Sequence, residues 1–491
     1  MVPRPPPPLA LLAAVVAVCV GAACGGGDGG REPRVERGSI DWEDCGGIDC
    51  ATLEVPLDHD DPGAGTIELA LGRRRASGDD VIGALLFNPG GPGAPAVELL
   101  DRAEELFTPA VLERFDVVTW DPRGVGESTP VDCVDDLDRF FAVDRSPDDA
   151  AEVEANLAEA RRLAAGCERR SGELLAHLSS RSTVRDMELI REALGEPRLT
   201  YVGFSYGSYL GALYADAHPQ RVRAIVLDGA VDPARSYEQT ALDQARGFDG
   251  ALAAFFAHCE RVDCGFGGSD PRAAYEDLMS QIDAETLPAV VAGERRLVGP
   301  GEADIGVATA LYAGEEGWDL LARALTSAAR GDGSILASLA DTYTGRLPGG
   351  EYDNDTEAFY ATGCLDGAAP PPGELAPTAQ RIAAEAPYFG AATLWLGAPC
   401  SVWPVPPDGS PAPVRAAGAP PIVVLGTTND PATPLAWAEA LAAQLESARL
   451  VVYEGEGHLA YARGDECVDR AVDAYLVDLE PPPAGLRCPA R

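Results

Sequence analysis

The sequence predicts an α/β fold in which helices cover both faces of a mostly parallel sheet and a large helical cap is inserted into the chain. Short apolar runs bounded by Gly, Pro and Asp, typical of buried strands, occur before residue 235 and again after residue 405. LTYVGFS, SYLGALYADAH and VRAIVLDG follow one another as strand, helix and strand, which is the order of a parallel crossover. Residues 236–404, by contrast, are mostly helical in pattern, with almost no strand-like runs.

The expected elements follow in chain order. The first strands lie between Ile40 and Val118, in the runs ATLEVPL, TIELALG, VIGALLFN and FDVVTWD. Residues 147–195 are predicted to form helices because apolar residues recur at spacings of three and four, and the last of these helices ends near Gly195. The final strands are PIVVLG and LVVYEG, which flank an amphipathic helix around residues 434–448.

These elements divide the chain into five segments. A signal peptide and a flexible tether come first, and the cap then interrupts the core. The segments are residues 1–23 (signal peptide), 24–38 (tether), 39–235 (first part of the core), 236–404 (helical cap) and 405–491 (second part of the core).

Composition excludes several classes of function. Asp and Glu number 78 against 38 basic residues, and the resulting net charge of −40 repels phosphate backbones and anionic headgroups. We therefore expect no nucleic-acid binding. All basic residues are Arg, which excludes a Walker A lysine, a Schiff base and a Ser-Lys pair. The candidates for a base near neutral pH are His59, His177, His218, His258 and His458.

The first segment has the pattern of an export signal. Residues 9–23 form an uninterrupted apolar run that is short for a membrane span and typical of a signal-peptide core. Small residues precede Cys24 and a Gly-rich stretch follows it, which resembles a bacterial lipoprotein cleavage site with Cys24 as the lipidated residue. Gly21 departs from the aliphatic residue usual there, so secretion after cleavage at Ala23 stays open. We expect an exported protein that contacts the membrane only through such an anchor.

Ten cysteines remain after Cys19 and Cys24 are assigned to the signal and the lipid. An even number in an exported chain favours disulfides over metal ligation. The metal alternative, His258 with Cys259 and Cys264, lacks the paired C-x-x-C spacing of zinc sites, and we expect no metal. The sequence does not fix the connectivity, but neighbours along the chain could pair as Cys45–Cys50, Cys133–Cys167, Cys259–Cys264, Cys364–Cys400 and Cys467–Cys488.

The candidate nucleophile is Ser205, in the G-x-S-x-G motif of residues 203–207. The motif is common by chance in a Gly-rich chain, and the competing interpretation is an ordinary turn serine. Here a strand precedes the motif and a helix follows it, so the serine hydroxyl is expected to project at the carboxyl end of the sheet. This context favours the nucleophile.

A serine hydroxyl needs a base and an acid to activate it. His458 follows the LVVYEG strand and Asp430 follows PIVVLG, so both are expected at the same edge of the sheet as Ser205. Asp228 and Asp232, after VRAIVLDG, are the rival acids. We predict a triad of Ser205, Asp430 and His458.

The oxyanion formed during acyl transfer needs backbone donors. Residues 88–93, NPGGPG, follow an early strand and have little side chain to block inward-turned N–H groups. We predict the amides of Gly91 and Tyr206 as the oxyanion hole; the alternative is a plain Gly/Pro turn.

Taken together, these motifs resemble the tripeptidyl aminopeptidase and proline iminopeptidase branch of the α/β hydrolases over nearly the whole mature chain. Pro89 replaces a His that often precedes GGPG in the iminopeptidases, which favours the tripeptidyl type. CATLEVPLDHDDP, YATGCLD and CSVW resemble the exported members. The shared segments are PGGPG at 89–93, TWDPRGVGES at 119–128, LTYVGFSYGSYLG at 199–211 and those around Asp430 and His458.

The resemblance implies an α/β-hydrolase fold and an exported serine peptidase that needs no cofactor and acts on peptides at a free amino terminus. The cap would then restrict entry and supply carboxylates for the substrate ammonium. Glu315, Glu316 and Asp366 are candidates for that role, but a solvated surface charge is the favoured interpretation of each, so we leave them out of the site. The alternatives are an exported esterase or amidase of the same fold and a non-catalytic surface binding protein. The sequence does not set the oligomeric state.

Overall fold

The computed structural model describes residues 40–490. The expected signal peptide and the whole expected tether, including the candidate lipidation residue Cys24, lie outside the described residues. Within the described range, no helix combines the length and apolar character needed to cross a membrane.

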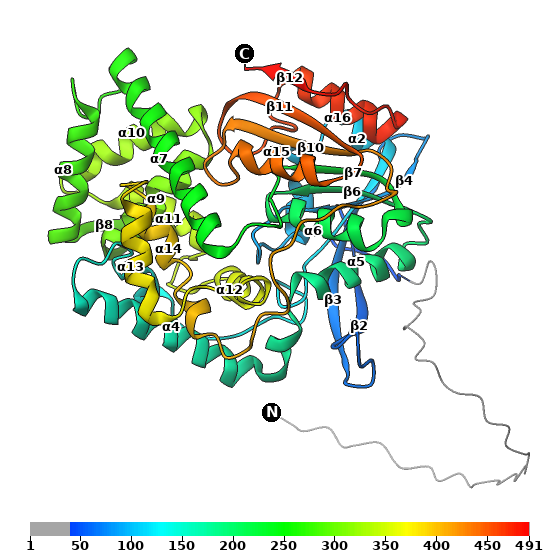
Figure 1. The fold of residues 1–491 in the computed structure, drawn as a ribbon, viewed down its shortest axis with the longest axis horizontal. Helices are drawn as coiled ribbons and strands as arrows, with labels where there is room; N and C mark the ends of the chain where they lie inside the picture. Colours follow the sequence, from blue (N-terminus) through cyan, green and yellow to red (C-terminus); the bar gives the residue numbers. More distant parts are fainter. Residues whose placement is uncertain (1–39, 491) are drawn as a thin grey trace, which may run out of the picture. The chain divides into compact units, whose positions relative to one another are not determined.

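A ten-stranded sheet forms the core, in the order β1-β2-β3-β5-β4-β6-β7-β10-β11-β12 (Figure 1). The pairs from β1 through β3 to β5 are antiparallel, and all the others are parallel. The predicted mostly parallel sheet is therefore confirmed. Its strands are β1 (Glu43–Asp44), β2 (Asp49–Pro56), β3 (Thr66–Arg74), β4 (Gly83–Asn88), β5 (Phe115–Trp120), β6 (Leu199–Phe204), β7 (Val222–Asp228), β10 (Ile422–Asn429), β11 (Ala448–Glu456) and β12 (Leu486–Pro489).

Helices cover both faces of this sheet, as expected. Every residue of β6 is buried, and β7 is buried except at Arg223, because strands covered on both faces have no solvated side. One face packs against α5 (Ser180–Ala193), α6 (Tyr206–Ala217) and α15 (Leu435–Gln444). The other packs against α2 (Pro109–Arg114) and α16 (Glu466–Asp478).

The cap has its own hydrophobic core, which includes Phe248, Phe255, Leu325 and Trp395. Its elements are α7 (Tyr237–Val262), α8 (Pro271–Ala284), β8 (Leu287–Val291), β9 (Glu294–Val298), α9 (Pro300–Tyr312), α10 (Glu315–Ala328), α11 (Ser334–Thr344), α12 (Asp355–Asp366), α13 (Pro372–Ala383), α14 (Gly390–Trp395) and η4 (Pro399–Val402).

One feature of the cap differs from the sequence prediction. β8 and β9 form an antiparallel hairpin where almost no strand was expected. Ala292 and Gly293 connect them with φ of 50° and 87°, the positive values that a two-residue hairpin turn requires. Ala is an uncommon residue at such a position, which is why the turn gives a weak sequence signal.

Residues before the cap segment also help to build the cap. α3 (Asp138–Ala142), α4 (Ala150–Ser171) and η2 (Gly172–His177) lie in the chain between β5 and α5. Leu157 and Ala160 of α4 belong to the cap's hydrophobic core. The cap is therefore assembled from two stretches of chain rather than one.

Five disulfides are present, and they are the pairs of neighbouring cysteines expected from the sequence. Cys133–Cys167 and Cys364–Cys400 lie in one hydrophobic cluster where α4 meets α12. Cys259 is bonded to Cys264, so these two sulfurs are not thiolate ligands beside His258.

Candidate active site

Ser205 stands in a strained turn between β6 and α6. Its φ of 54° and ψ of −122° place a non-glycine residue where few are found, and its N–H donates to the carbonyl of Asp228 at 2.8 Å. A Cβ on Gly203 would lie 2.2 Å from the Gly207 carbonyl oxygen, and one on Gly207 would lie 2.4 Å from the Asn88 carbonyl oxygen. Only glycine fits at either place, so the motif is required by steric contact.

The acid and the base of the predicted triad are in direct contact. His458 Nδ1 lies 2.8 Å from Asp430 Oδ2 and 3.0 Å from Oδ1. Asp430 is only 2 % exposed and also accepts hydrogen bonds from the N–H groups of Ala432 and Thr433, each at 2.9 Å. A carboxylate held by several fixed donors can orient an imidazole and stabilise its cation.

Strand order brings Ser205 to the same edge of the sheet. Ser205 follows β6, Gly229 follows β7, and β7 lies between β6 and β10. A Cβ on Gly229 would lie 2.9 Å from His458 Cε1, so the imidazole lies over the end of β7, the strand next to β6. Since Asp430 occupies Nδ1, Nε2 is the nitrogen left to accept the Ser205 proton.

The rival acids have other partners. Asp228 is fully buried and accepts the N–H groups of Gly229, Ala460 and Tyr461 at 2.8, 3.0 and 2.8 Å. Burial raises the pKa of Asp228. It therefore fixes the chain just after His458 instead of holding the imidazole nitrogen. Asp232 pairs with Arg235 at 3.0 Å and with Gln444 at 2.6 Å, and thus has a structural role.

The glycine loop after β4 lies against the nucleophile. A Cβ on Gly90 would lie 3.0 Å from Ser205 Cβ and 3.2 Å from the Tyr206 nitrogen. The Gly90 N–H donates to Asn88 Oδ1 at 3.0 Å, so Gly91 carries the next donor along the loop. The φ of 107° at Gly91 is open to glycine and strained for other residues. This arrangement supports Gly91 and Tyr206 as the oxyanion donors, which remain a prediction.

The cap touches His458, the predicted catalytic base, and the sequence did not predict this contact. Tyr312, the last residue of α9, accepts the His458 N–H on its carbonyl at 2.9 Å. Its ring also stands edge-on to the imidazole, with centroids 5.5 Å apart. A Cβ on Gly314 would lie 2.8 Å from the backbone of Glu456. The end of α9 thus braces the loop that carries His458.

Thr433 is a second residue that sequence reasoning missed. Its hydroxyl donates to Asp430 Oδ2 at 2.9 Å and lies 3.3 Å from His458 Nδ1. A signal was available, because a threonine three residues after an aspartate often bonds back to it.

The backbone at the start of α12 lies against the predicted oxyanion loop, and the first residue of that helix is acidic. A Cβ on Gly93 would lie 2.4 Å from the carbonyl oxygen of Asp355, the first residue of α12. Asp355 Oδ1 is buried without a hydrogen-bond partner among the described residues. Burial, with the nearby charges of Asp353 and Glu98, raises the pKa of Asp355 to about 8. Burial likewise raises the pKa of Asp353 to about 6. Carboxyls in this state favour a cation as ligand.

The three cap carboxylates considered from the sequence lie in different surroundings. Glu315 and Glu316 are exposed at the start of α10, as surface charges would be. For Asp366 the surface interpretation is wrong. Its two oxygens accept the N–H and the hydroxyl of Ser180, because α12 ends against the start of α5.

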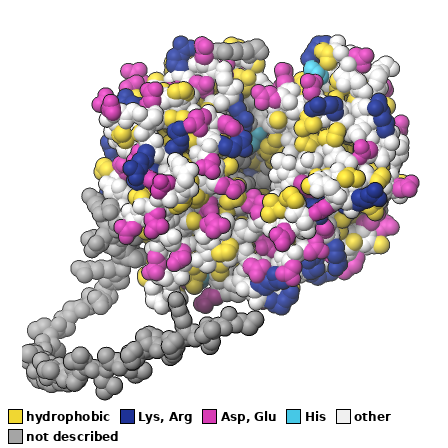
Figure 2. All heavy atoms as spheres, turned by 180° about the vertical axis from the view of Figure 1, so that it is seen from behind, with side chains coloured by type: hydrophobic (Ala, Val, Ile, Leu, Met, Phe, Trp, Pro, Cys, Tyr) yellow, Lys and Arg dark blue, Asp and Glu magenta, His cyan; other side chains and the backbone are white. Residues whose placement is uncertain are grey.

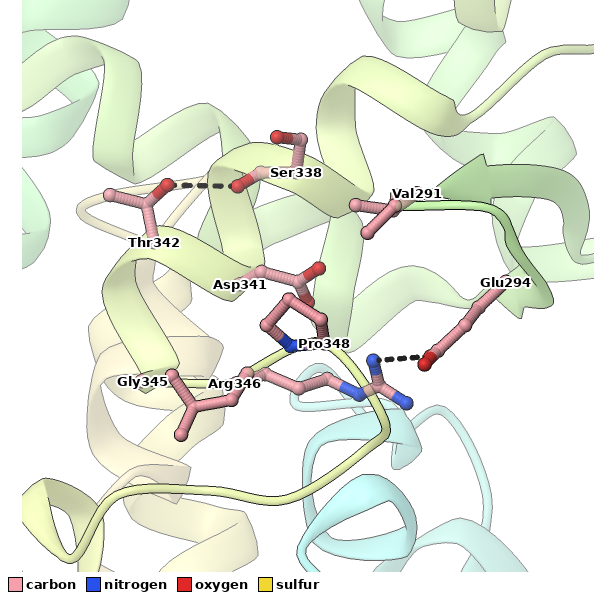
Figure 3. A pocket seen from close by; sticks show the side chains of 10 residues that line it. Val291, Glu294, Ser338, Asp341, Thr342, Gly345, Arg346 and Pro348 are labelled. Atoms are coloured by element: carbon pink, nitrogen blue, oxygen red, sulfur yellow. Dashed lines mark hydrogen bonds and ion pairs between the residues drawn. The ribbon is translucent and has the colours of Figure 1, made fainter.

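The cap also carries a surface pocket of about 330 Å³ between its hairpin and α11 (Figure 3). Arg346 pairs there with Glu294 of β9 and also reaches Asp138 of α3. None of the predicted catalytic residues lines this pocket. The space-filling view shows acidic and basic side chains mixed over one face of the molecule, with a hollow near the middle of that face (Figure 2).

The fold and the site together define a serine hydrolase of the α/β-hydrolase class. A sequence profile described as TAP-like protein matches residues 386–488. The serine protease Hip1 of Mycobacterium tuberculosis is 36% identical, covering 93% of this chain and 92% of its own. The chain belongs to this TAP-like family of α/β hydrolases, which confirms the resemblance found in the sequence.

Two further relatives have different names. The carboxylesterase B of M. tuberculosis is 38% identical, over 89% of this chain and 86% of its own. The tripeptidyl aminopeptidase of Streptomyces lividans is 32% identical, over 90% and 85%. Membership of the family therefore gives the class of enzyme and leaves the choice between peptide and ester bonds to the site.

Proposed function

We propose that the protein is an exported aminopeptidase that releases short peptides, tripeptides above all, from free amino termini. The observation that carries this proposal is the buried carboxyl oxygen Oδ1 of Asp355, which has no hydrogen-bond partner among the described residues and lies at the start of α12, the helix whose backbone contacts the glycine loop. A substrate ammonium bound there would place a positive charge beside the carboxyl groups of Asp355 and Asp353. An ester without an amino group would gain nothing from that contact. The names of the peptidase relatives agree with this assignment.

The mechanism follows from the geometry of the site. Ser205 attacks the carbonyl carbon while His458 Nε2 takes its proton, and Asp430 stabilises the resulting imidazolium. The N–H groups of Gly91 and Tyr206 would stabilise the oxyanion, each donor lowering the barrier by roughly 3–4 kcal/mol. His458 then protonates the leaving amine. Water, deprotonated by the same histidine, then attacks the ester of the acyl-enzyme, so that the short peptide leaves with a free carboxylate and His458 returns the proton to Ser205.

Export is part of the proposal. The apolar run of residues 9–23 and the small-residue site before Cys24 support it. The five disulfides agree with an oxidising compartment. Cell fractionation with metabolic labelling by a fatty-acid analogue tests the anchor. Wild type should carry label in the membrane fraction, and Cys24→Ala should not. Wild type without label, recovered free of membrane, would favour simple secretion.

The activity is tested by digesting a peptide library with wild type and with Ser205→Ala, and reading the products by mass spectrometry. We expect tripeptides from free amino termini, none from acetylated peptides and none with the variant. Internal cleavage would contradict the proposal.

An exported esterase or amidase is the second candidate, favoured by the similarity to carboxylesterase B. Nitrophenyl esters hydrolysed faster than peptide arylamides with free amino termini would support it. A non-catalytic binding role would require that a fluorophosphonate probe fail to label Ser205.

A further inference from the structure

Tyr206 connects the nucleophile to the cap through its side chain. Its hydroxyl is hydrogen-bonded to the hydroxyl of Ser180, the first residue of α5, which is completely buried. The Ser180 hydroxyl also reaches the carboxylate of Asp366, the last residue of α12. The Ser180 N–H donates to the other oxygen of the same carboxylate at 2.9 Å. Three elements therefore meet in one chain of hydrogen bonds beside Ser205.

The direction of this chain follows from hydrogen-bond chemistry. An ionised carboxylate only accepts, so the Ser180 hydroxyl donates to Asp366. A hydroxyl has a single proton, so Ser180 must accept from Tyr206. The order is Tyr206 to Ser180 to Asp366, and the negative end lies on the cap.

The acceptor end of the chain is itself firmly held. The Cys364–Cys400 disulfide joins α12 to η4 two residues before Asp366. The Asp408 N–H donates to the Leu365 carbonyl at 2.8 Å. Asp366 therefore lies at a point where the cap packs against the core.

We propose that Asp366 is a positioning residue for catalysis: through Ser180 it fixes the Tyr206 side chain and so keeps the Tyr206 N–H aimed at the oxyanion. The proposal rests on the catalytic role of Ser205 and is independent of whether the substrate is a peptide or an ester. It assigns to the cap a part in the chemical step as well as in substrate selection.

Protonation of Asp366 would reverse the chain. The groups that face it are Arg181 from α5, Tyr206 and Tyr209 from α6, and Asp408 from the segment after η4. Burial raises the pKa of Asp366 to about 7. A protonated carboxyl would donate to Ser180, which would then donate to Tyr206, and the Tyr206 proton would lose its acceptor. The charge-assisted anchoring is present above about pH 7 and weakens as the pH falls, although Ser180 and Tyr206 stay hydrogen-bonded in the reversed order.

The test compares Asp366→Asn, Tyr206→Phe and the double variant, with Asp408→Asn as the matched control. Asp408 accepts from the neighbouring Ser179 hydroxyl at 2.6 Å but is not part of the chain to Tyr206. Both single variants should lower kcat by about tenfold with KM changed less than about twofold, because the oxyanion donor is displaced and not removed. The double variant should be no slower than either single variant.

The substrates are a nitrophenyl ester and a peptide arylamide, and fluorophosphonate labelling gives a third rate. The ester and the probe need no ammonium site, so failure of the aminopeptidase proposal would leave these two readouts intact. In wild type, kcat should contain a component that falls below about pH 7 and is missing from Tyr206→Phe. Asp408→Asn removes a negative charge that raises the pKa of Asp366, so it should keep the plateau of kcat and move the pH-dependent component to lower pH.

Three results would overturn the proposal: unchanged kcat in both single variants, additive losses in the double variant, or an equal loss in Asp408→Asn. If thermal melting shows that Asp366→Asn is unfolded, Tyr206→Phe decides alone. It keeps the ring and the backbone N–H, and removes only the hydroxyl.

Discussion

The core and the cap contribute to the site in different ways. Ser205, Asp430 and His458 each follow a strand of the sheet, so the topology delivers them to one edge. The cap reaches the same edge through the carbonyl of Tyr312 and the carboxyl of Asp366. The comparison indicates that the core carries the predicted reacting groups, whereas the cap contacts the segments that hold them.

The largest effect should come from removing the nucleophile. Ser205→Ala should lower kcat by at least about 10⁴-fold, since no other hydroxyl can form the acyl-enzyme. The assay is hydrolysis of ester and arylamide, with thermal melting as control for folding. Substantial remaining activity on both substrates would assign the chemistry elsewhere in the molecule.

Asp430→Asn should follow closely, with a loss of about 10⁴-fold in kcat, because an amide favours the wrong tautomer of His458. The melting temperature of Asp430→Asn should stay close to that of wild type, which would show that the loss of kcat is not a folding defect.

Asp228→Asn is the matched variant on the next strand and should act on stability. The buried carboxyl accepts backbone N–H groups from Gly229, Ala460 and Tyr461, and an amide cannot accept from all of them. We expect about 1–3 kcal/mol of lost folding free energy by denaturant titration. If instead Asp228→Asn lowered kcat as much as Asp430→Asn and left the folding free energy unchanged, the assignment of Asp430 as the acid of the triad would be contradicted.

Asp355→Asn tests the cap side of the comparison. Loss of the ammonium contact should reduce kcat/KM for arylamides with a free amino terminus by roughly 10- to 100-fold, the worth of one charge-assisted hydrogen bond. Hydrolysis of a nitrophenyl ester should not change, nor should either reaction in Glu316→Gln, an exposed cap carboxylate. If kcat/KM fell equally for the ester and the arylamide, Asp355 would have a structural role and would not bind the substrate ammonium.

The pH dependence of this contact has a definite sign. Because burial raises the pKa of Asp355 to about 8, the carboxylate form gains population as the pH rises toward 8. The substrate amino group loses its proton above roughly pH 8. The KM for arylamides should therefore be lowest near pH 8, and Asp355→Asn should flatten that minimum.

The smallest effect concerns Thr433. Thr433→Val keeps the shape of the side chain and removes one donor to Asp430. We expect kcat to fall about three- to tenfold, equivalent to one ordinary hydrogen bond. Steady-state kinetics with unchanged KM would agree, and an unchanged kcat would show that the backbone donors alone orient Asp430.

The sequence predicted those parts of the site that depend on local rules. The glycines at 203 and 207 indicate a tight turn because any Cβ would collide there. The parallel order of the neighbouring strands follows from the alternation of strands and helices along the chain. The sequence predicted far less about the cap. Helical periodicity shows that one face of a helix is buried but not against which partner, so the union of α4 with the cap was not foreseen. For the same reason Asp366 was taken for a surface charge.

The hydrogen bond from His458 N–H to the Tyr312 carbonyl has a consequence for access. Because the cap is hydrogen-bonded to the main chain of His458, a movement of the cap away from the core would also displace this predicted general base. Substrates of the proposed peptidase would then have to enter while the cap stays in place, which would favour short or unfolded chains over folded proteins.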